Sequence, residues 1–383
     1  MLLTPPLSLY IHLPWCVRKC PYCDFNSHGQ RGVLPLDAYV DALMRDLEQD
    51  LPLTWGRVVH SVFFGGGTPS LFPAEHIDRI LAGARSRLQL APGCEVTLET
   101  NPGTAEHGLF EGYLEAGVNR LSFGVQSFDD GCLQRLGRIH DSNEAEVAVR
   151  MAQAAGFDNI NIDLMYALPG QDTAMALHDL ERAFALEPTH VSHYQLTLEP
   201  NTLFAARPPA GIADEDDAWD MQAHCQALLA DAGYAQYEVS AYARDGQRCA
   251  HNMNYWRFGD YLGIGAGAHG KITSGAGQEI LRRWKVKHPT AYLDSAGTAA
   301  SIGGDERIAS ERRPFEFMLN ALRLVDGFAW GDFEARTGLP RAAIAEPMRE
   351  AMARGWLEDS PDWVRPTELG RRFTNDVVSL FLN

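Results

Sequence analysis

The sequence predicts an α/β protein whose first half forms a parallel sheet, either closed as a barrel or open and doubly wound. Up to about residue 200, six apolar segments rich in Val, Ile, Phe and Tyr alternate with five helical segments. This alternation requires right-handed crossovers between parallel strands. The residues that could bind a ligand or take part in chemistry follow the ends of the predicted strands. Because sites at the carboxyl ends of strands are typical of parallel barrels, the pattern favours a barrel.

The expected elements of this half can be placed along the chain. The predicted strands are Leu7–Leu13, Val58–Phe64, Glu95–Glu99, Arg120–Gln126, Asn159–Met165 and Val191–Thr197. The predicted helices cover residues 37–51, 74–89, 105–116, 143–155 and 174–186. Asp37 and Thr104 are expected to cap helix N-termini, and Gly117 and Gly156 are expected to end helices.

The character of the sequence changes near residue 205, where Arg207-Pro208-Pro209-Ala210-Gly211 predicts a linker. The acidic run at 214–217 is expected to begin a solvated helix, because carboxylates are favourable at a helix N-terminus. A strand is predicted at Tyr237–Tyr242. Near the C-terminus, helices at 311–324, 330–337 and 341–354 and a short hairpin resemble a winged-helix module. We therefore expect three domains: 1–205, an α+β extension at 206–305, and 306–383.

Composition restricts the possible functions. The 383 residues are 45% hydrophobic and 22% charged, which is typical of a soluble globular protein. Seven cysteines without paired spacing argue against a disulfide framework and for a reducing compartment. We expect a cytoplasmic protein without an integral membrane segment, since neither a signal peptide nor a long apolar run is visible. The 50 acidic against 33 basic side chains make nucleic acid a poor partner.

The strongest functional signal is the C-x3-C-x2-C triplet of Cys16, Cys20 and Cys23. Three thiolates on one loop can hold an iron–sulfur cluster, and a four-iron cube held by three cysteines keeps one iron without a protein ligand. That iron is open to a small molecule, as the open position of a catalytic zinc site is. The alternatives are a zinc site or a disulfide with a spare thiol, but the chain has no second C-x2-C pair, and His12 and His28 could each add only one ligand.

A second signal is the turn Gly65-Gly66-Gly67-Thr68-Pro69 after a predicted strand. Glycines allow the backbone to approach a ligand closely and to adopt positive φ, and the proline fixes the exit of the turn. The turn is not a phosphate-binding loop of the Walker A type, since no Gly-Lys-Ser/Thr follows. A tight strand-to-helix turn without a ligand is the alternative.

Taken in order, these motifs resemble the oxygen-independent coproporphyrinogen oxidase family of radical-SAM proteins. The resembling segments are Tyr10–Cys16, Cys23–Ser27, Gly65–Pro69, Glu99–Pro102, Gly124–Phe128, Leu136–Arg138 and Asn161–Gln171. The resemblance implies a partial (β/α)6 barrel with a [4Fe-4S] cluster and S-adenosyl-L-methionine. It implies Cys16, Cys20 and Cys23 as cluster ligands, with Tyr10 and the backbone at Tyr22 beside them. The residues implied for adenosylmethionine are Gly66, Gly67, Thr68, Glu99, Gln126, Arg138 and Asp163, although Arg138 or Asp163 taken singly could form a structural salt bridge.

Two departures from the oxidase favour a different function. Phe25 stands where the oxidase has an additional cysteine, and Tyr10 lies close to the start of the chain, where the oxidase has an N-terminal extension. The run His251-Asn252-Met253-Asn254-Tyr255-Trp256 resembles the H-N-x-x-Y-W motif of the HemW-type heme chaperones. This resemblance implies a protein that binds heme and delivers it to heme-requiring respiratory proteins. It is compatible with acceptors that are bound to a membrane and with a homodimer of this protein.

The heme ligand is the least determined part of this interpretation. His251 can supply an imidazole for heme iron, and Tyr255 and Trp256 offer flat apolar surface to a porphyrin. His269 and Cys249 are alternative ligands. Two competing functions are oxidative decarboxylation of coproporphyrinogen III by a 5′-deoxyadenosyl radical, and radical chemistry on another substrate.

Overall fold

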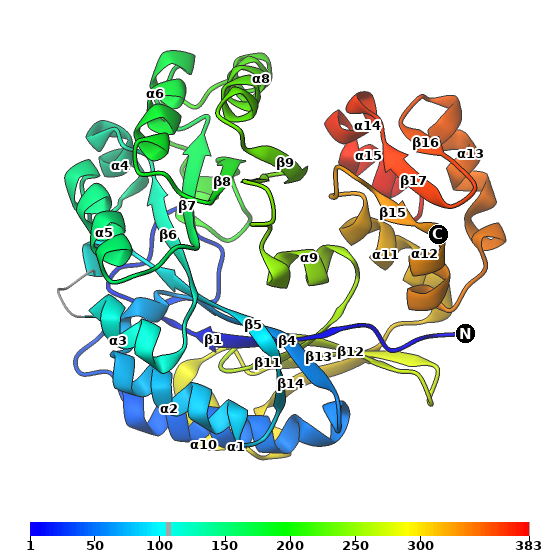
Figure 1. The fold of residues 1–383 in the computed structure, drawn as a ribbon, viewed down its shortest axis with the longest axis horizontal. Helices are drawn as coiled ribbons and strands as arrows, with labels where there is room; N and C mark the ends of the chain where they lie inside the picture. The colour runs from blue at the N-terminus through cyan, green and yellow to red at the C-terminus, as the bar shows by residue number, and fades with distance from the viewer. Residues whose placement is uncertain (105–108, 383) are drawn as a thin grey trace.

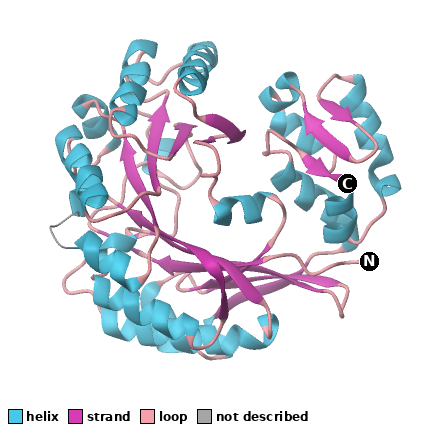
Figure 2. Cartoon of the chain, in the orientation of Figure 1, coloured by secondary structure: helices cyan, strands magenta, loops and turns pink. Residues whose placement is uncertain are grey.

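A computed structural model describes residues 1–104 and 109–382 of the chain. Its centre is a twelve-stranded sheet in the order β14-β13-β12-β11-β1-β4-β5-β6-β7-β8-β10-β9. The sheet curves around an interior, and helices cover its outer face (Figures 1 and 2). Because β14 and β9 are separate edges, the sheet is a partial barrel, which confirms the predicted α/β fold class.

The six strands expected from the sequence form most of the parallel part of this sheet. They are β1 (Leu7–Leu13), β4 (Val58–Gly66), β5 (Gln89–Thr100), β6 (Arg120–Gln126), β7 (Ile160–Tyr166) and β8 (His190–Gln195). Each pairs in parallel with the next along the chain. Their apolar side chains pack in the main core with those of the surrounding helices, as expected for parallel strands that are covered by helices.

The helices of this half are α1 (Leu36–Thr54), α2 (Ala74–Arg85), α3 (Leu109–Ala116), α4 (Asp130–Leu136), α5 (Ser142–Ala154) and α6 (Thr173–Phe184). Gly117 and Gly156 adopt φ of 103° and 102° after α3 and α5, which confirms both stops. The start predicted for the third helix, at 105–108 after Thr104, lies outside the described residues.

Two expectations for these helices were wrong, and one helix was missed. Asp37 lies in the first turn of α1, whose N-cap is Pro35. The helix predicted to reach residue 89 ends at Arg85, because the following residues extend β5 back to Gln89. Helix α4 was not predicted; its N-cap Asp129 accepts a hydrogen bond from the amide of Cys132.

The chain after residue 206 continues the same sheet. Helix α8 (Glu215–Asp231) begins at Asp214, whose carboxylate accepts from the amide of Asp217, so the acidic run does start a helix. The single strand predicted at 237–242 is a hairpin of β9 (Ala235–Glu238) and β10 (Ala241–Ala243). Strand β11 (Asp260–Ile264) pairs in parallel with β1. The outer strands are β12 (His269–Ser274), β13 (Glu279–Lys285) and β14 (Ile302–Arg307).

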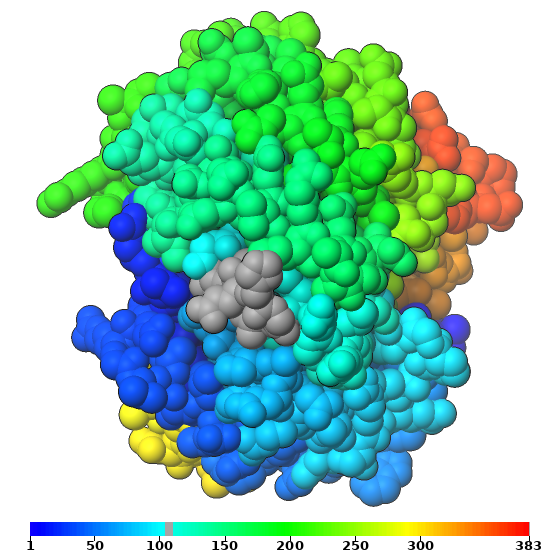
Figure 3. Space-filling view, turned by 60° about the vertical axis from the view of Figure 1, so that its left-hand side comes forward, coloured from blue at the N-terminus to red at the C-terminus, as the bar shows by residue number. Residues whose placement is uncertain are grey.

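A buried ionic cluster ties helix α1 to β13 and to α10 (Pro289–Ser295). Lys285 pairs with Asp46 and, at 2.7 Å, with Asp50, while the hydroxyl of Tyr292 donates to Asp46 at 2.7 Å. Removing one partner of such a cluster leaves a buried charge uncompensated. These contacts therefore hold the region near residue 290 against the N-terminal helix, and Figure 3 shows the yellow segment beside the blue one.

The C-terminal module (residues 310–382) supplies most of a second core, which includes Phe317, Phe328 and Val364 and also contains Leu2 and Phe258 from outside the module. Helices α11 (Arg313–Ala321), α12 (Trp330–Thr337) and α13 (Ala345–Ala353) pack with a three-stranded sheet in the order β15-β17-β16. The strands are β15 (Phe328–Ala329), β16 (Leu357–Asp359) and β17 (Trp363–Pro366), followed by two short helices, α14 (Glu368–Arg372) and α15 (Thr374–Ser379). Three helices and a hairpin are the arrangement predicted for the winged-helix-like module. None of the described helices is long and apolar enough to cross a membrane.

Candidate functional site

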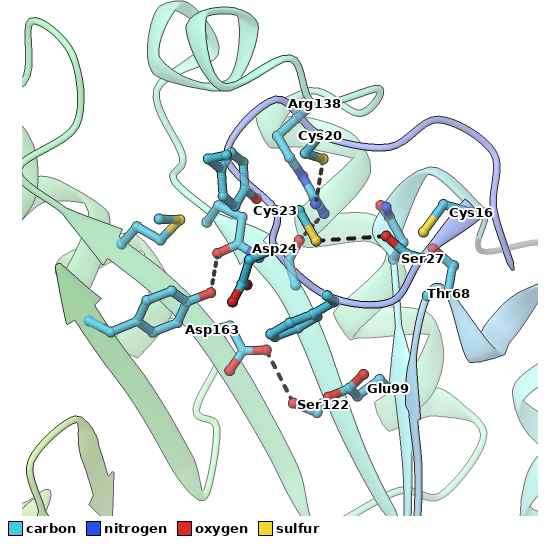
Figure 4. A pocket seen from close by; sticks show the side chains of 18 of the residues that line it. Cys16, Cys20, Cys23, Asp24, Ser27, Thr68, Glu99, Ser122, Arg138 and Asp163 are labelled. Carbon is cyan, nitrogen blue, oxygen red and sulfur yellow. Dashed lines mark hydrogen bonds between the residues drawn. The ribbon is translucent and has the colours of Figure 1, made fainter. Parts of the chain in front are cut away.

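A cavity of about 550 Å³ opens at the carboxyl ends of β4 to β8. Most residues singled out in the sequence line it: Cys16, Cys20, Tyr22, Cys23, Gly66, Gly67, Thr68, Glu99, Gln126, Arg138 and Asp163. Figure 4 shows the cysteines on the loop side of the cavity and Glu99, Ser122 and Asp163 on the strand side. Tyr10 and His251 do not line it.

The cysteines lie on a loop that is closed at its base by backbone pairing. Strands β2 (Trp15–Cys16) and β3 (His28–Gly29) run in parallel, and the amide of Gln30 donates to the carbonyl of Cys16 at 2.7 Å. Inside the loop, the ammonium of Lys19 donates to the carbonyl of Phe25 at 2.8 Å. The loop is therefore ordered by its own backbone, and all three thiols are free and half-buried.

These thiols fit an iron–sulfur cube. Burial raises the pKa of Cys16 and of Cys23, and a coordinating metal removes such protons outright. The guanidinium of Arg138 lies 3.6 Å from the sulfur of Cys20, where it can balance the charge of a thiolate. No group of three His, Cys, Asp or Glu among the described residues could hold a single ion. A cube binds each thiolate through a different iron, so its ligands stand further apart than those of one zinc ion.

The glycine turn is pressed against the cysteine loop. The amides of Gly67 and Thr68 donate to the carbonyls of Leu13 and Trp15 at 2.8 and 2.7 Å. A Cβ on Gly67 would lie 2.5 Å from the carbonyl oxygen of Trp15, and Gly66 has a φ of 114°. Part of the glycine requirement therefore comes from packing rather than from a ligand, although both glycines also line the cavity.

Two carboxyl groups face the cavity from β5 and β7, the strands on either side of β6. Glu99 accepts a hydrogen bond from the amide of Gly66 at 3.3 Å, and burial, with a smaller effect of Asp163, raises the pKa of Glu99 to about 8. Asp163 accepts from Ser122 at 3.2 Å and from Asn161 at 2.8 Å, and burial raises its pKa as well. The charge of Arg120 lowers both pKa values in part, but burial outweighs it. Two buried carboxyls in one cavity form a site that favours a positively charged ligand.

Arg138 and Gln126 complete the polar wall. Arg138 donates to the carbonyl of Gly124, and neither Arg138 nor Asp163 forms an ion pair with another residue in the described part of the chain. Gln126 has a φ of 74°, and its side-chain oxygen accepts from the hydroxyl of Tyr194 at 2.7 Å. Positive φ at a non-glycine residue is strained and concentrates at functional sites.

Sequence reasoning missed further lining residues, among them Ser122, Ser192 and Tyr194. Ser122, Gly124 and Gln126 alternate along β6, and Ser192 and Tyr194 alternate along β8. Since alternate residues of a strand face the same side, the position of Gln126 could have indicated its partners on β6.

Tyr10, expected beside the cluster, is not among the residues that line the main cavity. Its hydroxyl is 3.0 Å from Nδ1 of His12, and its ring centroid is 6.3 Å from that of His251. His251 itself is 8% exposed, with Nδ1 3.2 Å from the hydroxyl of Ser61 and its ring 4.9 Å from Phe63. Burial lowers the pKa of His251 to about 3.

The other heme-ligand candidates differ in accessibility. Cys249 is buried, its sulfur lies 3.5 Å from a carboxylate oxygen of Glu95, and burial raises its pKa to about 12. His269 is exposed at the start of β12 and stacks on Trp284 with ring centroids 6.1 Å apart. The structure therefore places Cys249 and His251 together at one end of α9 (Ala250–Trp256), and His269 on a different strand.

The start of α9 is held by a carboxylate from the barrel. Glu95 accepts from the amides of Ala250 and His251 at 3.1 and 3.2 Å, whereas the N-cap Cys249 provides no side-chain cap. We expect Glu95→Ala to lower the free energy of unfolding by about 0.5–2 kcal/mol, the usual effect of losing a helix cap. Urea denaturation measures this, with Glu115→Ala on the exposed face of α3 as the control. An equal effect of both changes would show that Glu95 does not stabilise α9.

A partial barrel with three free cysteines on the loop after its first strand defines a protein of the radical-SAM class. The family model described as Radical SAM superfamily matches residues 10–183, and the HemN C-terminal domain model matches residues 308–373.

The chain belongs to the HemW family of heme chaperones. It is 48% identical over 382 residues to heme chaperone HemW of Escherichia coli (strain K12), a match that covers 100% of both chains. It is 47% identical to heme chaperone HemW of Haemophilus influenzae, covering 99% of this chain and 98% of that one. A solved structure of coproporphyrinogen III oxidase (HemN) from Escherichia coli, a radical SAM enzyme, has a TM-score of 0.84 at 23% identity, covering 99% of this chain and 90% of that one; this likeness shows the fold.

Proposed function

We propose that this protein binds heme and delivers it to heme-requiring respiratory proteins, while its barrel carries a [4Fe-4S] cluster and S-adenosyl-L-methionine. The observation that carries the proposal is the likeness to relatives named heme chaperones along the whole chain, α9 included. Heme-accepting proteins, in some cases membrane-bound, are the proposed partners. A homodimer is compatible with this role, and the site of action would be the cytoplasm.

The residues of the main cavity suit the two barrel cofactors. Cys16, Cys20 and Cys23 would hold the cluster, whose open iron would bind adenosylmethionine. Glu99 and Asp163 would attract the positive charges of that ligand, and the backbone at Gly66 and Gly67 would approach it closely. When bound, the cluster and adenosylmethionine would supply one-electron chemistry. The proposed chaperone role does not require that adenosylmethionine be cleaved.

The competing function is coproporphyrinogen III oxidation, and the fold shared with the oxidase is the observation in its favour. Phe25 argues against it. This residue lines the cavity, is 58% exposed, and presents a phenyl ring where the oxidase has a cysteine. A phenyl ring can neither ligate metal nor donate a hydrogen atom as a thiol can.

His251 is the proposed axial ligand, and its burial adds a condition. Because the ring packs on Phe63 and contacts Ser61, heme can reach it only if α9 moves away from β4. We therefore expect heme binding to His251 to be slower than diffusion and to depend on the mobility of α9.

The wild-type protein should bind heme saturably and should not consume coproporphyrinogen III. Anaerobic, cluster-loaded protein titrated with hemin should develop a Soret band, and a parallel assay should find no decarboxylation. His251→Ala should lose or shift the component of that band that arises from heme at α9 while folding normally, whereas His178→Ala, exposed on α6, should not. Decarboxylation without saturable heme binding would overturn the chaperone proposal and support the enzyme.

A further inference from the structure

A second cavity, of about 610 Å³, borders the cysteine loop next to the main one. It lies between β3 and the start of α10, and Trp15, His28, Arg31, Leu34, His288 and Leu293 are among its lining residues. Ser27 lines both cavities, and its hydroxyl is 3.8 Å from the sulfur of Cys23. The second cavity is thus separated from the proposed cluster by little more than the backbone of this loop.

We propose that this second cavity is a heme-binding site, with His28 as the iron ligand, separate from the proposed site at α9. The inference rests on the proposed heme-binding function and adds a location and a ligand to it. Its volume falls within the range of about 300–1,000 Å³ that is usual for small-molecule and cofactor pockets.

The imidazole of His28 is set up as a ligand. Its Nε2 is buried, and no hydrogen-bond partner for it exists in the described part of the chain. The backbone of Lys287 acts on the ring and raises the pKa of His28 in part. Histidines that bind metal commonly use one ring nitrogen to fix the ring, which leaves the other nitrogen free for the metal. Burial and the neighbouring His288 also lower the pKa of His28, which favours the neutral form.

His288 stands in front of His28. The two ring centroids are 5.5 Å apart with an interplanar angle of 72°, which leaves no room for a porphyrin between them. His288 is exposed at the N-cap of α10, and its contact with the amide of Thr290 is 3.3 Å long, a weak cap. The side chain of His288 can therefore turn outward as heme enters the cavity. His28 would then be the one imidazole that binds the heme iron.

The walls and the rim match the two parts of a heme. Trp15, Leu34, Pro289 and Leu293 provide an apolar wall for the porphyrin ring. Arg31 lies on the rim, and the described lining includes no carboxylate, although the whole chain has a net charge of −17. A local excess of positive charge on an acidic protein suits the two propionates of heme.

The test compares hemin titrations of the cluster-loaded wild type, His28→Ala, His251→Ala and the control His178→Ala. We expect His28→Ala to lose a spectral component of the bound heme, or to bind it at least tenfold more weakly, and His251→Ala to retain that component. His28→Met, which offers a thioether in the same place, should shift the Soret band rather than abolish it. Unchanged iron and sulfide content in each variant would show that the cysteine loop is intact.

The outcomes separate the two proposals. Wild-type protein without saturable heme binding would remove the proposed function itself. Saturable wild-type binding that His28→Ala and His28→Met leave unaltered in affinity and spectrum would overturn the second site alone. Loss of heme binding in both His28 variants without a Met-ligated spectrum would also count against ligation by His28, because it would indicate a structural role.

Discussion

Replacing Cys16, Cys20 or Cys23 by serine should abolish the iron–sulfur cluster. The three thiols line one cavity on a loop whose base is fixed by β2 and β3, so each supplies a ligand that no neighbouring residue can replace. Anaerobically reconstituted wild type should contain close to four iron and four sulfide, following cube stoichiometry, and each variant should contain about none. Iron and sulfide analysis together with visible absorption measures the difference.

Cys225→Ala is the matched control for this prediction. Cys225 is a fully buried thiol on α8 that does not line the cavity, so its replacement should leave the cluster content unchanged. Serine variants that keep the wild-type iron content and visible spectrum would show that the cluster lies elsewhere or that the loop binds a different group.

Glu99→Gln should weaken adenosylmethionine binding by about ten- to a hundredfold near pH 8. The amide can still accept from the amide of Gly66, 3.3 Å from the carboxylate, but it removes a charge-assisted contact of roughly 1.5–3 kcal/mol. Calorimetry on cluster-loaded protein measures the affinity, with Glu115→Gln on α3 as the control. Equal affinity of wild type and Glu99→Gln at pH 8 would place the ammonium group elsewhere.

The pH dependence provides a sharper form of the same test. Because the pKa of Glu99 is about 8, its carboxyl is protonated at neutral pH in the free protein and must lose a proton to pair with a cation. Wild-type affinity should therefore rise roughly tenfold per pH unit below about pH 8. The amino group of the ligand itself titrates at about 7.7–8.0, so the profile should peak near there. Glu99→Gln should lack the rising limb.

Asp163→Asn should move the rising limb of the affinity profile to lower pH. The charge of Asp163 is the second cause of the raised pKa of Glu99, after burial, so its removal lets Glu99 ionise more easily.

The raised pKa of Glu99 also has a consequence for the stability of the protein without ligand. Unfolding frees the Glu99 carboxyl to ionise at its ordinary pKa, so stability should fall as the pH rises from about 4.5 to 8. Glu99→Gln should remove this fall, which urea denaturation at several pH values measures.

Much of the barrel could be predicted from the sequence because its signals are local. Strands β1 and β6 have the predicted bounds, since a run of apolar β-branched and aromatic residues determines its own conformation. The boundaries that were wrong lie where a local signal is ambiguous. Residues 86–89 continue the helical pattern of α2, yet they leave the helix because the next segment pairs with β4.

The sequence by itself determined which groups are present: a three-cysteine loop, a glycine turn, and carboxyl, guanidinium and amide groups at strand ends, in the order of a known family. Only the tertiary structure decided which of them meet and which are hidden. Glu99 and Asp163 come together because β5, β6 and β7 are adjacent and parallel, and their shared burial sets the pKa of Glu99. His251 is enclosed by β4, and His28 meets His288, which lies 260 positions further along the chain. Burial and pairing depend on contacts between distant segments, which no local pattern encodes.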